Sequence, residues 1–260
     1  MNKTQWVSIS VSFVLILVLF FAFDTTPKSQ KELEKSRILV AESTDINVLV
    51  TEAKEELGEA RSSGVMSLEN AIRETEDKST QIELYKQLSG TWYELEKHAI
   101  AGYYAQQVAS LDEQEESWSI AGTTYTIALQ RSTIKKERDF AAKRAVEAFE
   151  NAISLNPENP ANHVNLALVY TERPPEGNPM KGIQMLLKLN NDDPDNVVVL
   201  TTLGRLAIRT GQFERAVERL GKALELEPQN KNATCLLAQA YQGKGELDKA
   251  ATLQQRCENF

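Results

Sequence analysis

The sequence predicts an all-α protein: an α-solenoid of stacked helix–turn–helix hairpins, preceded by an N-terminal transmembrane helix. Three observations carry this prediction. A pattern of small and large residues recurs at a fixed interval near the C-terminus, an apolar segment lies close to the N-terminus, and no alternating apolar run typical of strands follows residue 23.

The recurring pattern places small residues at matching positions of two successive hairpins. Gly204 and Ala238 stand on the first helices, and Ala216 and Ala250 stand on the second helices, at an interval of about 34 residues. Each copy also has a glycine at the expected turn. Because small side chains let two helices approach closely, we expect these four residues to lie between paired helices rather than in solvent.

This pattern resembles the tetratricopeptide repeat family. The family's first helix carries a large residue, a leucine, a small residue and a tyrosine; its second helix carries alanine, an aromatic residue or leucine, and alanine, and a proline closes the unit. The resemblance is specific over Val197–Phe260, includes insertions over Trp118–Pro194 and is weaker over Ile82–Leu111. It is closest in kind to membrane-anchored bacterial members, and it implies a solenoid that holds other proteins or peptides in a concave groove.

Composition shifts along the chain predict its organisation. The expected parts are a membrane anchor over residues 1–23 with its transmembrane helix at 6–23, a linker over 24–44, an N-terminal helical segment over 45–78 and a repeat domain over 79–260. The repeats are expected at about 82–114, 115–159, 160–196, 197–230 and 231–260.

Local signals predict where helices stop and start in the first half. Ser62, Ser63 and Gly64 are expected to separate two helices within the N-terminal segment. Thr80 and Glu83 have the spacing of a capping box, which predicts that the first repeat helix begins there.

The apolar run Trp6–Phe23 has about 18 residues, which as a helix would span about 27 Å, close to the hydrocarbon thickness of a bilayer. Its length favours an uncleaved anchor over a cleaved signal peptide. Two arguments on orientation conflict. The basic residues that follow the run predict a cytoplasmic domain. A short tail with a single lysine before the run is typical of an uncut export signal, which favours a bacterial inner-membrane protein with its repeats in the periplasm.

Two departures from the regular repeat carry predictions of their own. The stretch from Gly122 to Ala145 is about eleven residues longer than in a standard unit, or about three helical turns, which predicts a lengthened hairpin with its tip between about Ser132 and Glu137. The run Arg173–Pro179 is rich in proline and predicts a stiff surface loop.

The final helix is expected to have a polar outer face. Gln254 stands where Phe149, Leu186 and Leu220 stand in the preceding second helices. A terminal repeat needs such a face because no further repeat covers it.

The totals exclude several function classes. Asp and Glu number 37 against 29 Lys and Arg, for a net charge of −8, and no basic stripe interleaved with aromatics indicates nucleic-acid binding. The two cysteines and two histidines are scattered, which excludes a four-ligand zinc site of the usual spacing. No phosphate loop or nucleophile elbow is present. We therefore expect no catalytic residue, no metal, no cofactor, no small-molecule substrate and no enzymatic activity.

The resemblance implies that groove positions on the first helices contact a protein or peptide partner. These positions are Val164, Leu168, Val198, Thr201, Arg205, Ile208, Arg209, Asn232, Cys235, Gln239 and Gln242. Arg205 and Arg209 are four residues apart and share a helix face, so they can clamp a carboxylate or an acidic segment. The alternative is that they pair with nearby glutamates or are simply solvated.

Cys235 and Cys257 lie on the two antiparallel helices of the last hairpin. In an oxidising compartment they can form a disulfide, which would stabilise the protein by about 3 kcal/mol. The reading favoured from sequence is two reduced, buried thiols.

These observations predict a membrane-anchored scaffold or adaptor that binds protein or peptide partners. The resemblance implies an accessory factor in envelope assembly, secretion or protein maturation. Three alternatives stay open: a cytosol-facing docking or import receptor, an enzyme with an unrecognised site before Trp118, and self-assembly through the N-terminal helices.

Overall fold

A computed structural model describes residues 28–260, with side chains from residue 46 onward except at Glu59 and Ala60. The predicted transmembrane helix over residues 6–23 lies outside the described residues. From Lys28 to the C-terminus, no helix combines the length and the apolar character needed to cross a bilayer.

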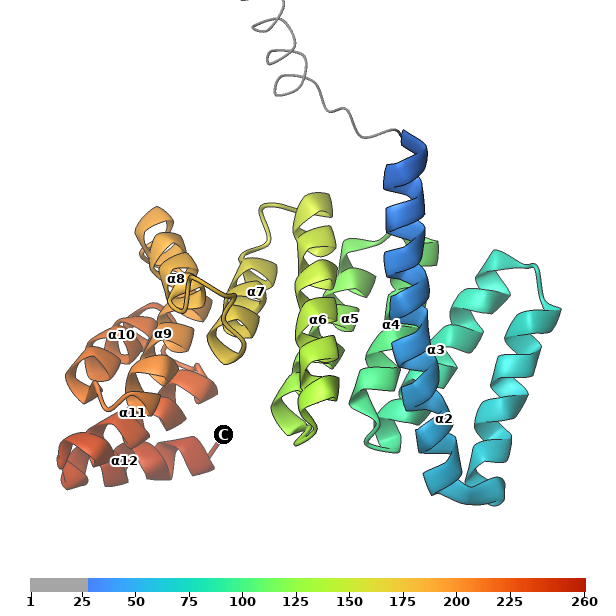
Figure 1. Cartoon of the computed structure of the whole chain (residues 1–260). Helices are drawn as coiled ribbons and strands as arrows, with labels where there is room; N and C mark the ends of the chain where they lie inside the picture. The colour runs from blue at the N-terminus through green and yellow to red at the C-terminus, as the bar shows by residue number, and fades with distance from the viewer. Residues whose placement is uncertain (1–27) are drawn as a thin grey trace, which may run out of the picture. The chain divides into compact units, whose positions relative to one another are not determined.

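All regular structure from residue 28 onward is α-helical, which confirms the all-α prediction (Figure 1). In chain order the helices are α2 (Lys28–Glu74), α3 (Lys78–Glu94), α4 (His98–Asp112), α5 (Glu115–Arg131), α6 (Lys135–Leu155), α7 (Pro160–Glu172), α8 (Lys181–Asp192), α9 (Val197–Arg209), α10 (Phe213–Leu226), α11 (Lys231–Lys244) and α12 (Leu247–Glu258).

Helix α2 is broken at Gly58, not at the predicted Ser62–Gly64. Gly58 has φ 71° and ψ 171°, a conformation that glycine adopts without steric penalty because it lacks Cβ. The helix continues through Ser62, Ser63 and Gly64 because serine opposes helix formation only weakly. The predicted linker is likewise helical from Lys28 onward. The chain divides next to Gly58 into two compact units, Met1–Glu56 and Leu57–Phe260.

The start of α3 also differs from the prediction, because Asp77 caps the helix in place of Thr80. The Asp77 carboxylate accepts a hydrogen bond from the Thr80 backbone N–H at 2.8 Å and from the Ser79 and Thr80 hydroxyls at 2.6 Å. The bond from Ser79, followed by those from Thr80, lowers the pKa of Asp77 to about 2. The helix therefore begins at Lys78 with Asp77 as its N-cap, three residues earlier than a Thr80 cap would give.

Within Leu57–Phe260, consecutive helices pair as antiparallel hairpins from α3/α4 to α11/α12, and each hairpin packs on the next (Figure 1). The small residues lie between helices as predicted. Gly204 is buried, and Ala216, Ala238 and Ala250 are 0%, 3% and 8% exposed. A Cβ on Gly204 would lie 2.6 Å from Cγ of Leu220, so the contact requires glycine. This packing confirms the helical-repeat prediction.

The lengthened hairpin is α5/α6. Helix α6 has 21 residues, against 12 in α8, and the two helices of the hairpin are joined at Ser132–Ile134. At this tip the Ser132 hydroxyl donates to Glu137 at 2.6 Å and accepts from the Ile134 N–H at 3.1 Å. The predicted position of the tip is confirmed.

The proline-rich segment forms the predicted loop, which runs from Arg173 to Met180 between α7 and α8. The predicted polar face of α12 is also present, since Gln254 is exposed. By contrast, Phe149, Leu186 and Leu220 are each 0% exposed in the preceding second helices.

Three asparagines cap first helices of successive hairpins, a feature that the sequence analysis did not identify. The side-chain carbonyl of Asn159 accepts from the Ala161 N–H, that of Asn196 from the Val199 N–H, and that of Asn230 from the Ala233 N–H. These bonds satisfy backbone donors that a helix leaves unpaired at its N-terminus.

Candidate functional site

The structure separates the predicted groove residues by exposure. The exposed residues are Val198, Arg205, Arg209, Asn232, Gln239 and Gln242. The half-buried residues are Leu168, Ile208 and Cys235, and the buried residues are Val164 and Thr201. The exposed residues can contact a partner without rearrangement, and the buried Val164 cannot.

Val164 was predicted to face the groove, but it belongs to the core. It is 2% exposed and packs in a cluster with Leu186 of α8 and Leu203 of α9. Leu168 packs against the same cluster. An apolar side chain on α7 gains more from this burial than from exposure to solvent, which explains why these two positions turn inward.

Four of the predicted groove residues meet in one pocket of about 160 Å³. Val198, Thr201 and Arg205 project from α9, and Asn232 projects from the start of α11. The remaining lining residues are Val197, Thr202, Glu227 and Asn230. The structure thus brings together side chains that are about 30 residues apart in sequence, as the stacking of first helices requires.

The polar groups of this groove pocket are incompletely satisfied. The hydroxyl of Thr201 is buried, and it has no hydrogen-bond partner in the described part of the chain. Arg205 is exposed and forms no ion pair with any residue that the structure places. Glu227 is occupied by the Asn230 amide, which donates to it at 2.8 Å. The unpaired guanidinium of Arg205 beside this small pocket is suited to an acceptor group such as a carboxylate.

The guanidinium of Arg209, by contrast, is already paired. Its Nη1 lies 2.5 Å from Oε1 of Glu172 on α7, so the alternative of pairing with a nearby glutamate holds for Arg209. Because this pair is partly exposed, it contributes no more than about 1 kcal/mol to stability. The predicted two-arginine clamp is therefore reduced to Arg205.

Cys235 and Cys257 form a disulfide between α11 and α12, with their Cα atoms 5.1 Å apart. The favoured expectation of two reduced thiols is thus wrong. The antiparallel hairpin brings the two positions within the range that a disulfide requires. As a result, Cys235 has no free thiol to offer a partner.

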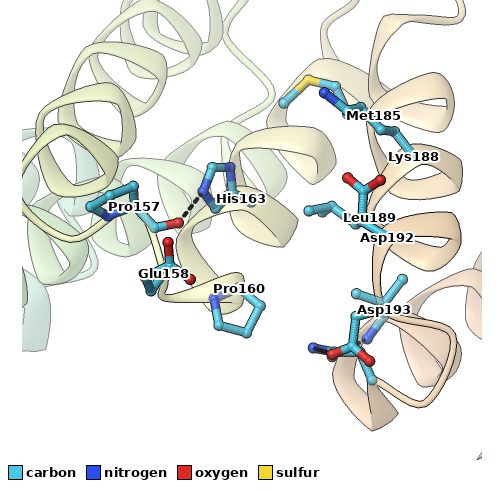
Figure 2. Close-up of a pocket in the computed structure, with 11 residues that line it drawn as sticks. Pro157, Glu158, Pro160, His163, Met185, Lys188, Leu189, Asp192 and Asp193 are labelled. Carbon is cyan, nitrogen blue, oxygen red and sulfur yellow. Dashed lines mark hydrogen bonds between the residues drawn. The ribbon is translucent and has the colours of Figure 1, made fainter.

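A cavity of about 530 Å³ was not predicted. It lies between α7 and α8 and reaches the start of α9 (Figure 2). His163 lines it, and the Nε2 atom of His163 lies 2.9 Å from the carbonyl oxygen of Pro157. One signal was present in the sequence. His163 stands four residues before the small residue of α7, and the matching position holds Trp118 in α5 and Leu200 in α9.

Before Trp118, the region where a hidden enzyme site was considered, one histidine is buried. His98 is 5% exposed, and neither ring nitrogen has a hydrogen-bond partner in the described structure. Burial, and secondarily the charge of Arg131, lowers the pKa of His98. His98 lines a small pocket with Ser132 and Glu137 but forms no hydrogen bond with either. Across residues 46–58 and 61–260, no three potential metal ligands gather.

Comparison with protein families identifies a tetratricopeptide repeat model that matches residues 207–256. Two curated proteins are similar over part of their length. The BBSome complex member BBS4 of Bos taurus is 26% identical over 167 residues, which cover 64% of this chain and 30% of that protein. The interferon-induced protein with tetratricopeptide repeats 3 of Mus musculus is 29% identical over 139 residues, covering 51% of this chain and 33% of that protein. The chain thus spans about a third of the length of these curated relatives.

Solved structures agree on the fold. A tetratricopeptide repeat protein of Parabacteroides merdae superposes with a TM-score of 0.51 at 14% identity, over 83% of this chain and 80% of that one. A thermophilic tetratricopeptide repeat protein of Thermus thermophilus superposes with a TM-score of 0.50 at 18% identity, over 77% of this chain and 99% of that one. These likenesses show the helical-repeat fold, and the tetratricopeptide repeat match covers residues 207–256 within it.

Proposed function

We propose that this chain, built from tetratricopeptide repeats, is a scaffold that binds other proteins or peptides in the groove along α9 and α11. The observation that carries the proposal is the groove pocket, in which a buried Thr201 hydroxyl and an exposed Arg205 are left without partners. The exposed guanidinium of Arg205 can take a carboxylate of a partner without rearrangement of the pocket. The name of the bovine relative, a member of a protein complex, is consistent with such a role.

The mechanism is equilibrium binding to a preformed surface. The groove pocket is lined by two rigid helices, so little conformational freedom is lost from the scaffold when a partner binds. Arg205 would take a carboxylate of the partner, while Asn232 offers an amide for its backbone.

Affinity capture from solubilised membranes tests this proposal. The full chain and the Arg205→Glu variant serve as baits, and captured proteins are quantified by mass spectrometry. Arg215→Glu is the matched control, because Arg215 is an exposed arginine on α10, outside the groove pocket. Specific loss of a partner with Arg205→Glu supports the proposal. Equal capture by both variants rejects Arg205 as a contact.

We further propose that the chain is an inner-membrane protein anchored by residues 6–23, with the repeats in the periplasm, where it assists envelope assembly, secretion or protein maturation. The Cys235–Cys257 disulfide supports an oxidising compartment. An anchor would also raise the local concentration of the groove at the membrane.

The alternative is a docking receptor with its repeats in the cytosol, which the basic residues after the apolar run favour. Reporter fusions after Phe260 decide between the two placements. Alkaline phosphatase is active only outside the cytosol, and a fluorescent protein that folds only in the cytosol reports the opposite. Fluorescence without phosphatase activity would reject the periplasmic placement.

A further inference from the structure

Helices α7 and α8 touch at one end of their hairpin and enclose a cavity at the other. Near the turn, Gly182 lies against α7 so closely that a Cβ would sit 2.7 Å from the Thr171 backbone nitrogen. Beside it, Nζ of Lys181 lies 3.7 Å from the centre of the Tyr170 ring. At the opposite end, the 530 Å³ cavity separates His163 from Met185 and its neighbours on α8 (Figure 2). We call this space the α7/α8 cavity.

The cavity lies beside His163, at a position where two other hairpins carry a large apolar side chain. Four residues before the small residue of the first helix, α5 and α9 carry the large apolar residues Trp118 and Leu200, and α11 carries Thr234. Trp118 packs against a core cluster, and Leu200 is 3% exposed. His163 instead bonds to the Pro157 carbonyl oxygen and points its ring toward the loop before α7 (Figure 2). The α7/α8 cavity therefore lies where the His163 ring turns away from α8.

Its walls and its rim differ in chemistry. Pro160, Met185 and Leu189 line the walls with apolar atoms. The carboxylates at the rim belong to Glu158, Asp192 and Asp193, and the one cationic side chain among the lining residues is that of Lys188. Asp193 accepts a hydrogen bond from the Asn196 amide at 3.1 Å. Glu158 and Asp192 are exposed and form no ion pair with the described residues.

We propose that the α7/α8 cavity is a second binding site, separate from the groove pocket, for a partner segment in which a large apolar side chain stands beside a lysine or arginine. The apolar side chain would enter between Pro160 and Leu189, and the cation would meet the carboxylates at the rim. The volume falls in the range of about 300–1,000 Å³ that is typical of ligand sites. The excess of carboxylates selects the charge of the partner.

Methyl NMR on the full chain tests the proposal directly. The sequence has 4 methionines, so the spectrum of a methionine-methyl-labelled sample is simple. The probe is a short peptide with blocked ends that carries tryptophan followed by lysine in a glycine–serine background. We expect a saturable shift of the Met185 methyl signal, while Met66 on α2 does not respond. Two control peptides replace the lysine with glutamate or the tryptophan with alanine, and both should bind at least about fivefold more weakly.

Three variants complete the test. His163→Trp, which places a larger side chain in the cavity, should obstruct it and weaken the response. Glu158→Gln combined with Asp192→Asn, which leaves the cavity open, should weaken binding about fivefold. The matched control Glu225→Gln changes an exposed carboxylate on α10 and should bind as the parent chain does. Arg205→Glu should also leave this binding intact, which separates the second site from the groove.

The proposal would be overturned if the Met185 methyl signal did not shift on addition of the peptide. Equal shifts with the lysine and glutamate peptides would also overturn it. A Met185 shift that depends on protein concentration without peptide would assign the cavity to a second copy of the chain and would also overturn it.

Discussion

At the scale of single residues, a few polar side chains decide where the helices begin. Asn196 and Asn230 occupy the same place in successive repeats and make the same hydrogen bond to the backbone of their helices. Asn159 does the same at the start of α7. Asparagine is among the best residues at this position because its side chain replaces the missing intrahelical acceptor. The caps thus recur with the fold and hold α7, α9 and α11 in register.

We expect Asn196→Ala to lower the free energy of unfolding by about 1 kcal/mol, because the Val199 N–H loses its acceptor. Urea denaturation followed by circular dichroism measures this loss. Asn196→Asp retains an acceptor and serves as the control. An alanine variant as stable as the parent chain would show that water replaces the cap without cost.

Buried His98 should make stability depend on pH. Burial and Arg131 lower its pKa from the ordinary value of 6.5, although Glu96 and Glu137 oppose this shift. The folded chain therefore binds a proton less readily than the unfolded chain. Stability is complete above the ordinary pKa and falls as the pH drops below about 6.5.

The test compares denaturant midpoints at pH 7.5 and pH 5.5. His98→Phe should remove most of the difference between them, whereas the control His163→Gln should retain it. A midpoint of the parent chain that does not change over this range would contradict the assigned protonation.

At the scale of helices and hairpins, spacing in the sequence predicted much of the fold. Small residues such as Gly204 and Ala238 mark where two helices cross, because the distance between the helices at that point is limited by the size of the side chain. The long α5/α6 hairpin followed from counting residues between two such contacts. The break at Gly58 and the α7/α8 cavity did not follow. Glycine permits a left-handed turn without requiring one, and the empty space beside His163 depends on how α8 tilts.

Two glycine substitutions separate close packing from helix propensity. Gly204→Ala should destabilise the chain by about 1–3 kcal/mol, because its Cβ would meet Leu220 at 2.6 Å. Gly221→Ala, in the interior of α10, meets nothing within 4 Å and should stabilise by about 0.5–1 kcal/mol. Thermal or urea unfolding of both variants measures these opposite effects. Equal effects in the two variants would refute the close contact at Gly204.

The candidate site was predictable only in part. The repeat spacing grouped Val198, Thr201, Arg205 and Asn232 as groove positions, and the structure places these four around one pocket. The spacing wrongly placed Val164 in the groove, because it does not show which side chains of α7 the neighbouring α8 covers. It also gave no sign that Glu172 lies within reach of Arg209, since that contact joins residues 37 positions apart.

At the scale of the whole repeat unit Leu57–Phe260, each hairpin is held mainly by its neighbours along the chain. Such arrays open locally, and a hairpin at the end of the stack, with one neighbour, opens most readily. In this unit the last hairpin carries the Cys235–Cys257 disulfide, which spans 22 residues. The covalent link therefore adds to the packing that holds α12 on α11.

Reduction of this disulfide should destabilise the last hairpin by about 3 kcal/mol. Hydrogen exchange read by mass spectrometry should then show faster exchange over residues 231–260 and unchanged exchange in α5 and α6. The serine pair Cys235→Ser with Cys257→Ser should reproduce the reduced state without reductant. Unchanged exchange over residues 231–260 after complete reduction would show that packing alone holds α11 to α12.

The Cys235–Cys257 disulfide also changes the outcome of proteolysis at the exposed turn between α11 and α12. A single cut after Lys244 leaves both fragments covalently joined, so the nicked chain keeps its mass on a non-reducing gel and releases a short C-terminal piece only when thiol is added. In a compartment rich in proteases, cleavage at this turn would thus break one peptide bond without releasing α12 from the rest of the chain.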